Sequence, residues 1–411
     1  MEFQVFLHVF AGLFVAVSAL APDTLRIVNV LYRHGDRSPV TVYPKDPHQA
    51  EEWPQGLGWL SETGMRQHYA LGQYLRSEYN NLLSAEYKRT EILVQSSNED
   101  RCLMSAYCDL AGLYPPSGDQ LWNPNITWQP IPVHTRPQEY DRKLNMGAPC
   151  PRYDELYDIE LQSPAVKAEE KENKDFYDFI EKKTGVKKEN ISEVWKIGDT
   201  LFCEKMHNKT MPDWVNDTIY TKLRNLQAWS FDLLYNGTEL SRLKGGPLLQ
   251  EFIYNMQQAA AGNVTYKMFM YSAHDSTVAA VSQAMQVFNQ KSPPYAAALL
   301  VELHQMSDGY KVRLRYRNDT QQDPYPLYHP ACPQDTEYCP LDTFVKGTKD
   351  RVPEDWAAEC HVVTDDEVAD VIAGTVLALM VVIMILCALL IITAIAWYRN
   401  QRVVRNFQRL P

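Results

Sequence analysis

The stretch that decides the fold is Leu25-Arg26-Ile27-Val28-Asn29-Val30-Leu31-Tyr32-Arg33-His34-Gly35-Asp36-Arg37-Ser38-Pro39. Its apolar first half, residues 25–31, predicts a buried β-strand, and its second half places a histidine between two arginines at the strand end. Guanidinium groups this close to an imidazole favour its neutral form. An anion would compensate for the crowding, and a phosphate held by bidentate arginine contacts is the natural candidate. For this stretch alone, an exposed basic turn is the alternative.

Apolar segments lie near both ends of the 411-residue chain. Residues 3–20 and the small residues that follow are typical of a secretory signal peptide, so we expect residues 1–21 to be removed. Residues 371–397 contain no charged side chain and are long enough to span a bilayer. Acidic residues precede this segment, and arginines follow it in the tail, residues 398–411. The asymmetry predicts a single-pass type I membrane protein with residues 22–370 in a lumen or outside the cell.

Other features agree with a lumenal or extracellular location. All asparagines in N-x-[ST] contexts lie between the two apolar segments, and we expect glycosylation among them: Asn125, Asn190, Asn208, Asn216, Asn236, Asn263 and Asn318. The chain has 8 cysteines, which favours an oxidising compartment. Its net charge of −11 argues against nucleic acid as a partner. A small phosphorylated substrate remains compatible, because it responds to the local field of a pocket.

The order of the predicted elements indicates an α/β fold with a mixed sheet flanked by helices. After the first strand, a helix is expected to start at Ser61 and a second strand at Ile92, followed by a helix whose capping box is Ser97 and Asp100. Strands are expected again at 267–271 and 297–303. Asp308-Gly309 then predicts a hairpin and therefore an antiparallel edge of the sheet.

Between these strands the pattern is helical. We therefore expect residues 141–245 to form a smaller all-helical domain, inserted in an α/β domain made of residues 22–140 and 246–365. Residues 320–365 are rich in proline and cysteine, and we expect a disulfide-tied stalk or cap before the membrane.

Charged side chains follow several of the predicted strands directly. Because ligands of open α/β sheets bind at the carboxyl ends of the strands, we expect these groups to meet in one site: Arg33, His34, Arg37, Arg101, His274 and Asp275. Three arginines can hold and neutralise a phosphoryl group without a metal or another cofactor.

Each of these residues has an expected role. His34 is the expected nucleophile and would form a phosphohistidine. Asp275 would protonate the leaving oxygen, which requires a protonated carboxyl and predicts best activity at acid pH. His274 would bind the phosphate or help to orient it. The sequence contains no Cys-x5-Arg phosphate loop, no Gly-x-Ser-x-Gly elbow, no Gly-x-x-x-x-Gly-Lys-[Ser/Thr] loop and no His-x-x-x-His metal-binding pair.

These motifs resemble those of the histidine acid phosphatases of the histidine phosphatase superfamily. The likeness rests on residues 33–39, 96–101 and 272–275, and on the stretches 43–47, 53–56 and 128–134, which are similar to the lysosomal and prostatic members. It runs from about residue 25 to residue 360. The resemblance implies a mixed-sheet α/β domain with a smaller helical domain, hydrolysis of orthophosphoric monoesters, and the assigned roles of the six residues.

The resemblance also implies a homodimer, with Trp128 and His134 at its interface. It implies disulfides between Cys150 and Cys360 and between Cys332 and Cys339. The family's partner for Cys203 falls near Ala298, so that bridge cannot form, and either Cys102 or Cys108 could be offered to Cys203 instead.

Other questions stay open. The tail motif Tyr398-Arg399-Asn400-Gln401 lacks the bulky apolar residue of a tyrosine sorting signal, which argues against lysosomal delivery. The cell surface is the alternative to the lysosomal membrane. Two alternative functions are a catalytically silent receptor or adhesion ectodomain and a specialised inositol-polyphosphate or nucleotide phosphatase. The intact set of six residues argues against the first, and the second would require further basic residues around the pocket.

Overall fold

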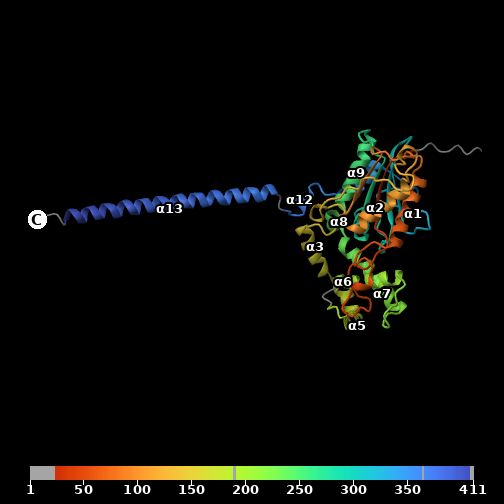
Figure 1. Ribbon diagram of the computed structural model, residues 1–411, viewed down its shortest axis with the longest axis horizontal. Helices are drawn as coiled ribbons and strands as arrows, with labels where there is room; N and C mark the ends of the chain where they lie inside the picture. Colours follow the sequence, from red (N-terminus) through yellow and green to blue (C-terminus); the bar gives the residue numbers. More distant parts are fainter. Residues whose placement is uncertain (1–23, 188–190, 363–364, 408–411) are drawn as a thin grey trace, which may run out of the picture.

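A seven-stranded mixed sheet forms the centre of the protein. The computed structural model describes residues 24–187, 191–362 and 365–407, so the predicted signal peptide lies outside the described part (Figure 1). The sheet has the order β2-β3-β1-β4-β5-β6, and β7 also pairs with β5. β1 pairs with β3 in parallel and with β4 antiparallel. The strands are β1 (Leu25–Arg33), β2 (Ile92–Ser96), β3 (Met268–Ala273), β4 (Ala298–Met306), β5 (Gly309–Arg317), β6 (Tyr325–Leu327) and β7 (Tyr338–Pro340).

Helices cover both faces of this sheet, which confirms the predicted α/β class. They are α1 (Glu62–Glu78), α2 (Asp100–Leu113), α3 (Pro151–Leu161), α4 (Pro164–Glu172), α5 (Lys174–Thr184), α6 (Ile191–Met206), α7 (Asp217–Tyr235), α8 (Thr238–Lys244), α9 (Gly246–Ala260), α10 (Asp275–Ala284), α11 (Leu341–Thr348), α12 (Trp356–Glu359) and α13 (Asp365–Phe407). The hairpin predicted at Asp308-Gly309 connects β4 to β5.

Residues of β1 alternate between two cores, because successive strand side chains point to opposite faces. Val28, Val30 and Tyr32 pack with residues of α1 and α2 on one face. Ile27 and Leu31 pack with residues of α9, α10 and α11 on the other. Both faces of β1 are therefore buried, and its carboxyl end is held rigidly in the middle of the sheet.

A separate core joins helices α4 to α7, which we call the helical part. Figure 1 shows α5, α6 and α7 of this part below the sheet. Tyr43, from the loop that follows β1, belongs to this core. Gly185 ends α5 in a left-handed conformation with φ 75°, which only glycine adopts without strain. The loop after β1 thus connects the sheet to the helical part.

Gly35 is required because the backbone of α1 approaches it closely. A Cβ on Gly35 would lie 2.5 Å from the carbonyl oxygen of Gly64, and one on Gly64 would lie 2.3 Å from the carbonyl oxygen of Asp36. Ser61 caps α1 as predicted, since its Oγ accepts a hydrogen bond from the N–H of Gly64 at 3.1 Å. The start of α1 therefore packs directly on the turn that follows β1.

The predicted capping box of Ser97 and Asp100 is wrong. The residue before α2 is Glu99, whose side chain makes no capping hydrogen bond. The Oγ of Ser97 instead lies 3.0 Å from Nε2 of His274, which follows a neighbouring strand. The Ser97 hydroxyl, which the local pattern assigned to the start of the helix, therefore bonds to a residue from a distant segment of the chain.

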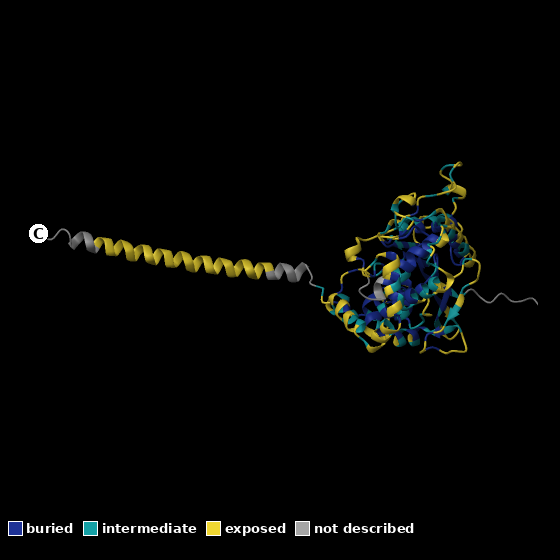
Figure 2. Cartoon of the chain, turned by 90° about the horizontal axis from the view of Figure 1, so that it is seen from below, coloured by how far each residue is buried: buried dark blue, intermediate teal, exposed yellow. Residues whose placement is uncertain are grey.

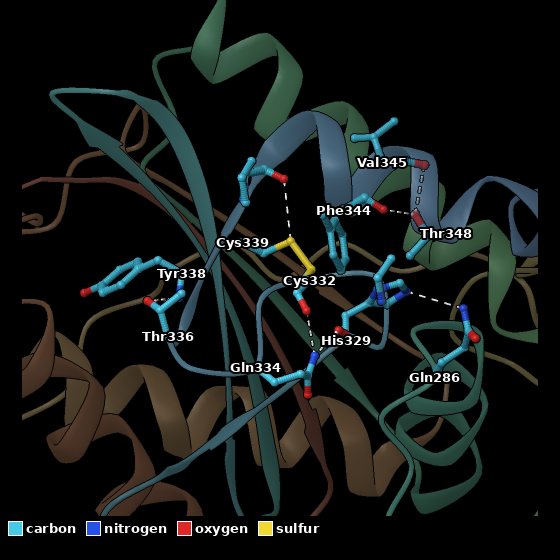
Figure 3. Close-up of a disulfide and its surroundings, with 12 residues drawn as sticks. Gln286, His329, Cys332, Gln334, Thr336, Tyr338, Cys339, Phe344, Val345 and Thr348 are labelled. Atoms are coloured by element: carbon cyan, nitrogen blue, oxygen red, sulfur yellow. Dashed lines mark hydrogen bonds between the residues drawn. A yellow bond between two sulfur atoms is a disulfide. The ribbon is translucent and has the colours of Figure 1, made fainter.

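Of the two alternatives predicted for residues 320–365, a disulfide-tied cap fits most of the segment and a stalk does not. β6 and β7 extend the sheet, and Cys332 and Cys339 belong to the same buried core as Phe344 of α11. Figure 3 shows the disulfide between these cysteines lying beside α11. The segment covers apolar residues of β5, such as Val312, that would otherwise face water.

The last helix, α13, extends away from the rest of the protein (Figure 1). Residues 372–402 of this helix are long and apolar enough to cross a membrane, and none of their most apolar window is buried in the protein (Figure 2). This helix matches the predicted span at residues 371–397.

Candidate active site

His34 directly follows β1, where its N–H donates to the carbonyl oxygen of Ala273 on β3 at 2.9 Å. Nδ1 of His34 lies 2.8 Å from the carbonyl oxygen of Gly35. Because a carbonyl oxygen can only accept, Nδ1 carries the ring proton and Nε2 keeps its lone pair. Burial, together with the charges of Arg33 and Arg37, holds the pKa of His34 well below its ordinary value. His34 is thus a neutral imidazole, the form that can act as a nucleophile.

Arg33 and Arg37 are each paired with a carboxylate from a distant segment. Nη2 of Arg33 lies 2.9 Å from Oδ2 of Asp275, and its guanidinium lies 4.2 Å from the centre of the Tyr295 ring. Both terminal nitrogens of Arg37 lie 3.1 Å from the oxygens of Asp199 on α6. These contacts fix the orientation of both guanidinium groups, so an anion that bound to either group would cost little further side-chain freedom.

Arg101 and His274 meet beyond the ends of β2 and β3. Nη1 of Arg101 lies 2.9 Å from Oε2 of Glu99, and its Nη2 lies 3.4 Å from Nδ1 of His274. Since a guanidinium only donates, Nδ1 accepts, and Nε2 carries the proton that it donates to Oγ of Ser97. Burial and the charge of Arg101 hold the pKa of His274 well below its ordinary value, so this ring is neutral too.

Asp275 is the first residue of α10, where the helix dipole favours a carboxylate. Its Oδ1 accepts a hydrogen bond from the N–H of Ser276 at 2.8 Å, and its Oδ2 contacts Arg33. The side chain is 18% exposed, whereas that of Arg33 is 2% exposed. Asp275 is therefore partly accessible, whereas the Arg33 side chain that contacts it is buried.

One cleft of about 300 Å³ brings five of the six predicted residues together: His34, Arg37, Arg101, His274 and Asp275. Its outer walls come from residues 145–147 and from α6 and α7 of the helical part. The site thus lies between the carboxyl ends of the strands and the helices that face them.

Asp36, the acid of the opening motif, is not among the lining residues of this cleft. It is 1% exposed, and its Oδ2 lies 2.5 Å from Oγ of Ser61 and 2.8 Å from Nε2 of His207. The hydrogen bond to Asp36 raises the pKa of His207. Asp36 therefore ties the turn that carries Arg37 to the residue that caps α1 and to the residue that follows α6.

Sequence reasoning missed the residues that support the cluster. Asp199 is an acid in a helical segment and Tyr295 an aromatic residue in a proline-rich loop, and neither carries a recognisable signal. Cys203 is a free thiol beside them, with Sγ 3.2 Å from Oη of Tyr295 and 3.4 Å from Nη1 of Arg37. Ser97 and Glu99 could have been predicted from the sequence as neighbours of the site, because they lie in the segment 96–101 that carries Arg101.

The disulfides of the structure join Cys150 to Cys360 and Cys332 to Cys339. Cys102 and Cys108 are free, as Cys203 is, so neither is bonded to it. Within the described ranges, no group of three or more histidine, cysteine or acidic side chains is arranged to hold a metal ion.

Comparison with known proteins agrees with this geometry. Residues 24–317 match the histidine phosphatase superfamily (branch 2), and the chain therefore belongs to this family, as its motifs predicted. It is 42% identical over 372 residues to lysosomal acid phosphatase of Homo sapiens, a match that covers 88% of this chain and 87% of that protein. It is 41% identical over 348 residues to prostatic acid phosphatase of Homo sapiens, covering 84% of this chain and 89% of that protein.

Solved structures share the fold at much lower identity. The phytase from Citrobacter braakii is 18% identical and superimposes with a TM-score of 0.63, covering 82% of this chain and 99% of that one. The apo form of Hafnia alvei phytase is 17% identical, with a TM-score of 0.63 over 84% of this chain and 99% of that chain. These matches confirm the histidine phosphatase fold.

Proposed function

We propose that this chain is an acid phosphatase that hydrolyses orthophosphoric monoesters through a covalent phosphohistidine at His34. The observation that carries the proposal is a neutral His34, hydrogen-bonded to Gly35 through Nδ1 and lining a cleft beside arginines. Membership of the histidine phosphatase superfamily and the acid phosphatases among its relatives favour the same reaction.

In the first step, Nε2 of His34 attacks the phosphorus atom, and the bond from phosphorus to the ester oxygen breaks. The arginines bind the phosphoryl oxygens and compensate for their negative charge, as phosphoryl transfer requires. Protonated Asp275 gives its proton to the ester oxygen, which leaves as an alcohol.

In the second step, water attacks the phosphorus of the phosphohistidine, and the bond from phosphorus to Nε2 breaks. The Asp275 carboxylate accepts a proton from the attacking water, and inorganic phosphate is released. The Gly35 carbonyl oxygen holds the ring of His34 throughout, and Ser97 holds His274 beside the phosphate. Side chains, ester and water supply every proton and electron pair of this cycle.

Two requirements determine the favoured pH. Asp275 must be protonated to act as an acid, whereas His34 must be neutral to act as a nucleophile. An ordinary histidine, with a pKa of about 6.5, would be protonated in acid solution. Burial and the arginines lower the pKa of His34, so it stays neutral while the pH falls into the range that protonates carboxyl groups. Activity is therefore expected to increase below neutral pH.

Replacing His34 tests this proposal. We expect His34→Ala to lower kcat for an aryl phosphate by at least about a thousandfold, since no other group can form the intermediate. Rapid quenching of the wild type with a radiolabelled ester should trap labelled His34. His361→Ala, which alters an exposed histidine outside the cleft, is the control. Full activity of His34→Ala would rule the mechanism out.

For the membrane arrangement, we propose a type I orientation with the cleft in a lumen or outside the cell. Arginines at positions 399 and 402 follow the apolar part of α13, as the positive-inside bias requires for a cytoplasmic tail. Asn190 lies outside the described residues. The other sequon asparagines are exposed, as glycosylation on that side requires: Asn125, Asn208, Asn216, Asn236, Asn263 and Asn318. Both the lysosomal membrane and the cell surface fit this orientation.

We also propose that the chain forms homodimers through the region of Trp128 and His134. Trp128 is 39% exposed, Trp122 beside it is 56% exposed, and the Trp122 indole N–H donates to the Trp128 carbonyl oxygen. Exposed aromatic residues of this kind are enriched in interfaces. We propose in addition that residues 141–245 form a helical domain beside an α/β domain, and the separate core of α4 to α7 supports this division.

A further inference from the structure

Glu99 places a negative charge in the wall of the active-site cleft. It precedes α2, but its carboxylate makes no capping hydrogen bond to that helix. One of its oxygens contacts Nη1 of Arg101 at 2.9 Å, and the other accepts a hydrogen bond from Nε2 of Gln138. Its side chain is 33% exposed. The carboxylate is therefore fixed in place beside the phosphate-binding groups and still faces solvent.

The rest of the cleft offers no cation to a second anionic group. Of the described residues that line it, Arg37 and Arg101 are the positively charged ones, because His34 and His274 are held neutral. Both arginines are expected to bind the transferred phosphoryl group. The outer walls are otherwise apolar or uncharged, with Val40, Met146, Trp195, Phe231 and Leu234 as their largest apolar side chains.

Arg224 of α7 is a further cation of the helical part, but it is not among the residues that line the cleft. Its guanidinium lies 4.2 Å from the centre of the Phe202 ring, and its Nη1 donates to Oε1 of Gln227. Beyond the phosphate-binding groups, the leaving group of a bound ester therefore meets apolar or uncharged side chains and the carboxylate of Glu99.

We propose that Glu99 is a specificity-determining residue, which directs this site to esters with a single phosphate and a neutral or cationic leaving group. The inference rests on the phosphatase activity proposed above. A second phosphate or a carboxylate on the substrate would lie near the Glu99 carboxylate in a partly enclosed cleft, where like charges repel more strongly than in bulk water. Inositol polyphosphates are then poor substrates, whereas a nucleoside monophosphate, whose leaving group is neutral, is acceptable.

The test uses the full-length chain and three substrates whose leaving groups differ in charge: phenyl phosphate, meta-carboxyphenyl phosphate and meta-(aminomethyl)phenyl phosphate. For each ester, kcat/KM of Glu99→Gln is divided by that of the wild type, so that intrinsic leaving-group reactivity cancels. We expect the quotient for the carboxylate ester to be roughly three- to tenfold higher than the quotient for phenyl phosphate. The quotient for the ammonium ester should be lower than that for phenyl phosphate by a comparable factor.

Two variants serve as controls. Glu99→Asp keeps the charge and should keep the wild-type preferences. Glu155→Gln removes a carboxylate whose side chain is 59% exposed on α3, outside the cleft, and should leave all three quotients equal. The charge-dependent change should also shrink as salt is added, since ions screen partly exposed charges.

Several outcomes would overturn the inference. Equal quotients for the three esters in Glu99→Gln would mean that Glu99 acts only by holding Arg101, or not at all. A changed preference in Glu99→Asp as large as that in Glu99→Gln would mean that shape rather than charge is responsible. In both cases phenyl phosphate is still hydrolysed, so the proposed phosphatase function stands. A wild type that hydrolyses none of the esters would overturn that function together with the inference.

Discussion

At the scale of single residues, Asp275 is held at both of its oxygens. Arg33 contacts Oδ2, and the N–H of Ser276 donates to Oδ1. Asp275 lines the cleft beside His34, whereas Arg33 is 2% exposed and is not among the lining residues. In the proposed mechanism, Asp275 therefore gives its proton to the ester oxygen from a fixed position.

Asp275→Asn removes the proton donor and keeps the side-chain shape. We expect kcat/KM for an alkyl phosphate to fall by about a thousandfold, because an alkoxide leaves poorly without a proton. The loss should be much smaller for a nitrophenyl phosphate, whose leaving group is stable as an anion. A plot of log kcat/KM against leaving-group pKa, steeper in the variant than in the wild type, would verify this.

Asp308→Asn, at a 69% exposed position in the β4–β5 hairpin, provides the comparison and should match the wild type. An equal loss for alkyl and aryl esters in Asp275→Asn would instead assign Asp275 the sole task of orienting Arg33.

At the scale of elements, α6 and the residue that follows it hold the turn after β1 in place. Asp199 and Cys203 of α6 both contact Arg37, and His207, directly after the helix, contacts Asp36. These residues recur at four-residue intervals, which places them on one side of the helix. The neighbouring Glu204 of α6 interacts electrostatically with Asp46 of the loop after β1. One helix of the helical part therefore acts on both Arg37 and the loop that follows it.

The carboxyl pair of Glu204 and Asp46 predicts a pH-dependent stability. Glu204 is fully buried, and burial followed by the charge of Asp46 raises its pKa. Tyr43, Asp46, Glu52 and Lys209 act on it electrostatically, and His48 acts on Asp46. Above the ordinary carboxyl pKa of about 4.3, the folded protein keeps a proton that the unfolded chain releases. The free energy of unfolding therefore falls as pH rises from that value through the raised pKa.

Glu204→Gln removes this titration. Its free energy of unfolding should exceed that of the wild type near neutral pH by an amount on the order of 1–3 kcal/mol and should converge with it at about pH 4. Urea denaturation at a series of pH values measures the difference. Glu172→Gln, which alters an exposed residue of α4, should parallel the wild type. If Glu204→Gln also ran parallel to the wild type, the pair would not titrate as described.

At the scale of the whole molecule, two disulfides close loops of very different length. Cys150 and Cys360 are separated by 210 residues and tie the start of α3 to the end of α12, shortly before the membrane helix. Cys332 and Cys339 are separated by 7 residues within the edge of the sheet. The chain between the two cysteines of the first bridge contains helices α4 to α7 and strands β3 to β7.

Loss of the two bridges should therefore have unequal effects. In the chain-entropy account, removing the long-range bridge by Cys150→Ala with Cys360→Ala costs about 5 kcal/mol, and removing the short one by Cys332→Ala with Cys339→Ala costs about 2 kcal/mol. Thermal unfolding of both double variants in the same detergent tests the order. An equal loss, or a larger loss for the short bridge, would contradict it.

Local patterns were sufficient for the chemistry and the coarse architecture. The apolar strand before His34, the helix start at Ser61 and the uncharged segment at residues 371–397 are determined by burial and hydrogen-bond requirements within a few residues. The types and spacing of neighbouring residues are therefore enough to predict these features. The positions of Arg101 and Asp275 at strand ends follow from the same kind of local pattern.

Only the tertiary structure decided how these groups are paired. Asp199 contacts Arg37 across 162 residues of sequence, and Ser97 contacts His274 across 177. Periodicity indicates which face of an element is buried but not which faces meet, so neither pair was predictable. The predicted capping box at Ser97 was wrong for the same reason. The Ser97 hydroxyl bonds to the imidazole of His274, which is distant in the sequence. Glu99, fixed beside Arg101, became a candidate for substrate selection only once the walls of the cleft were in place.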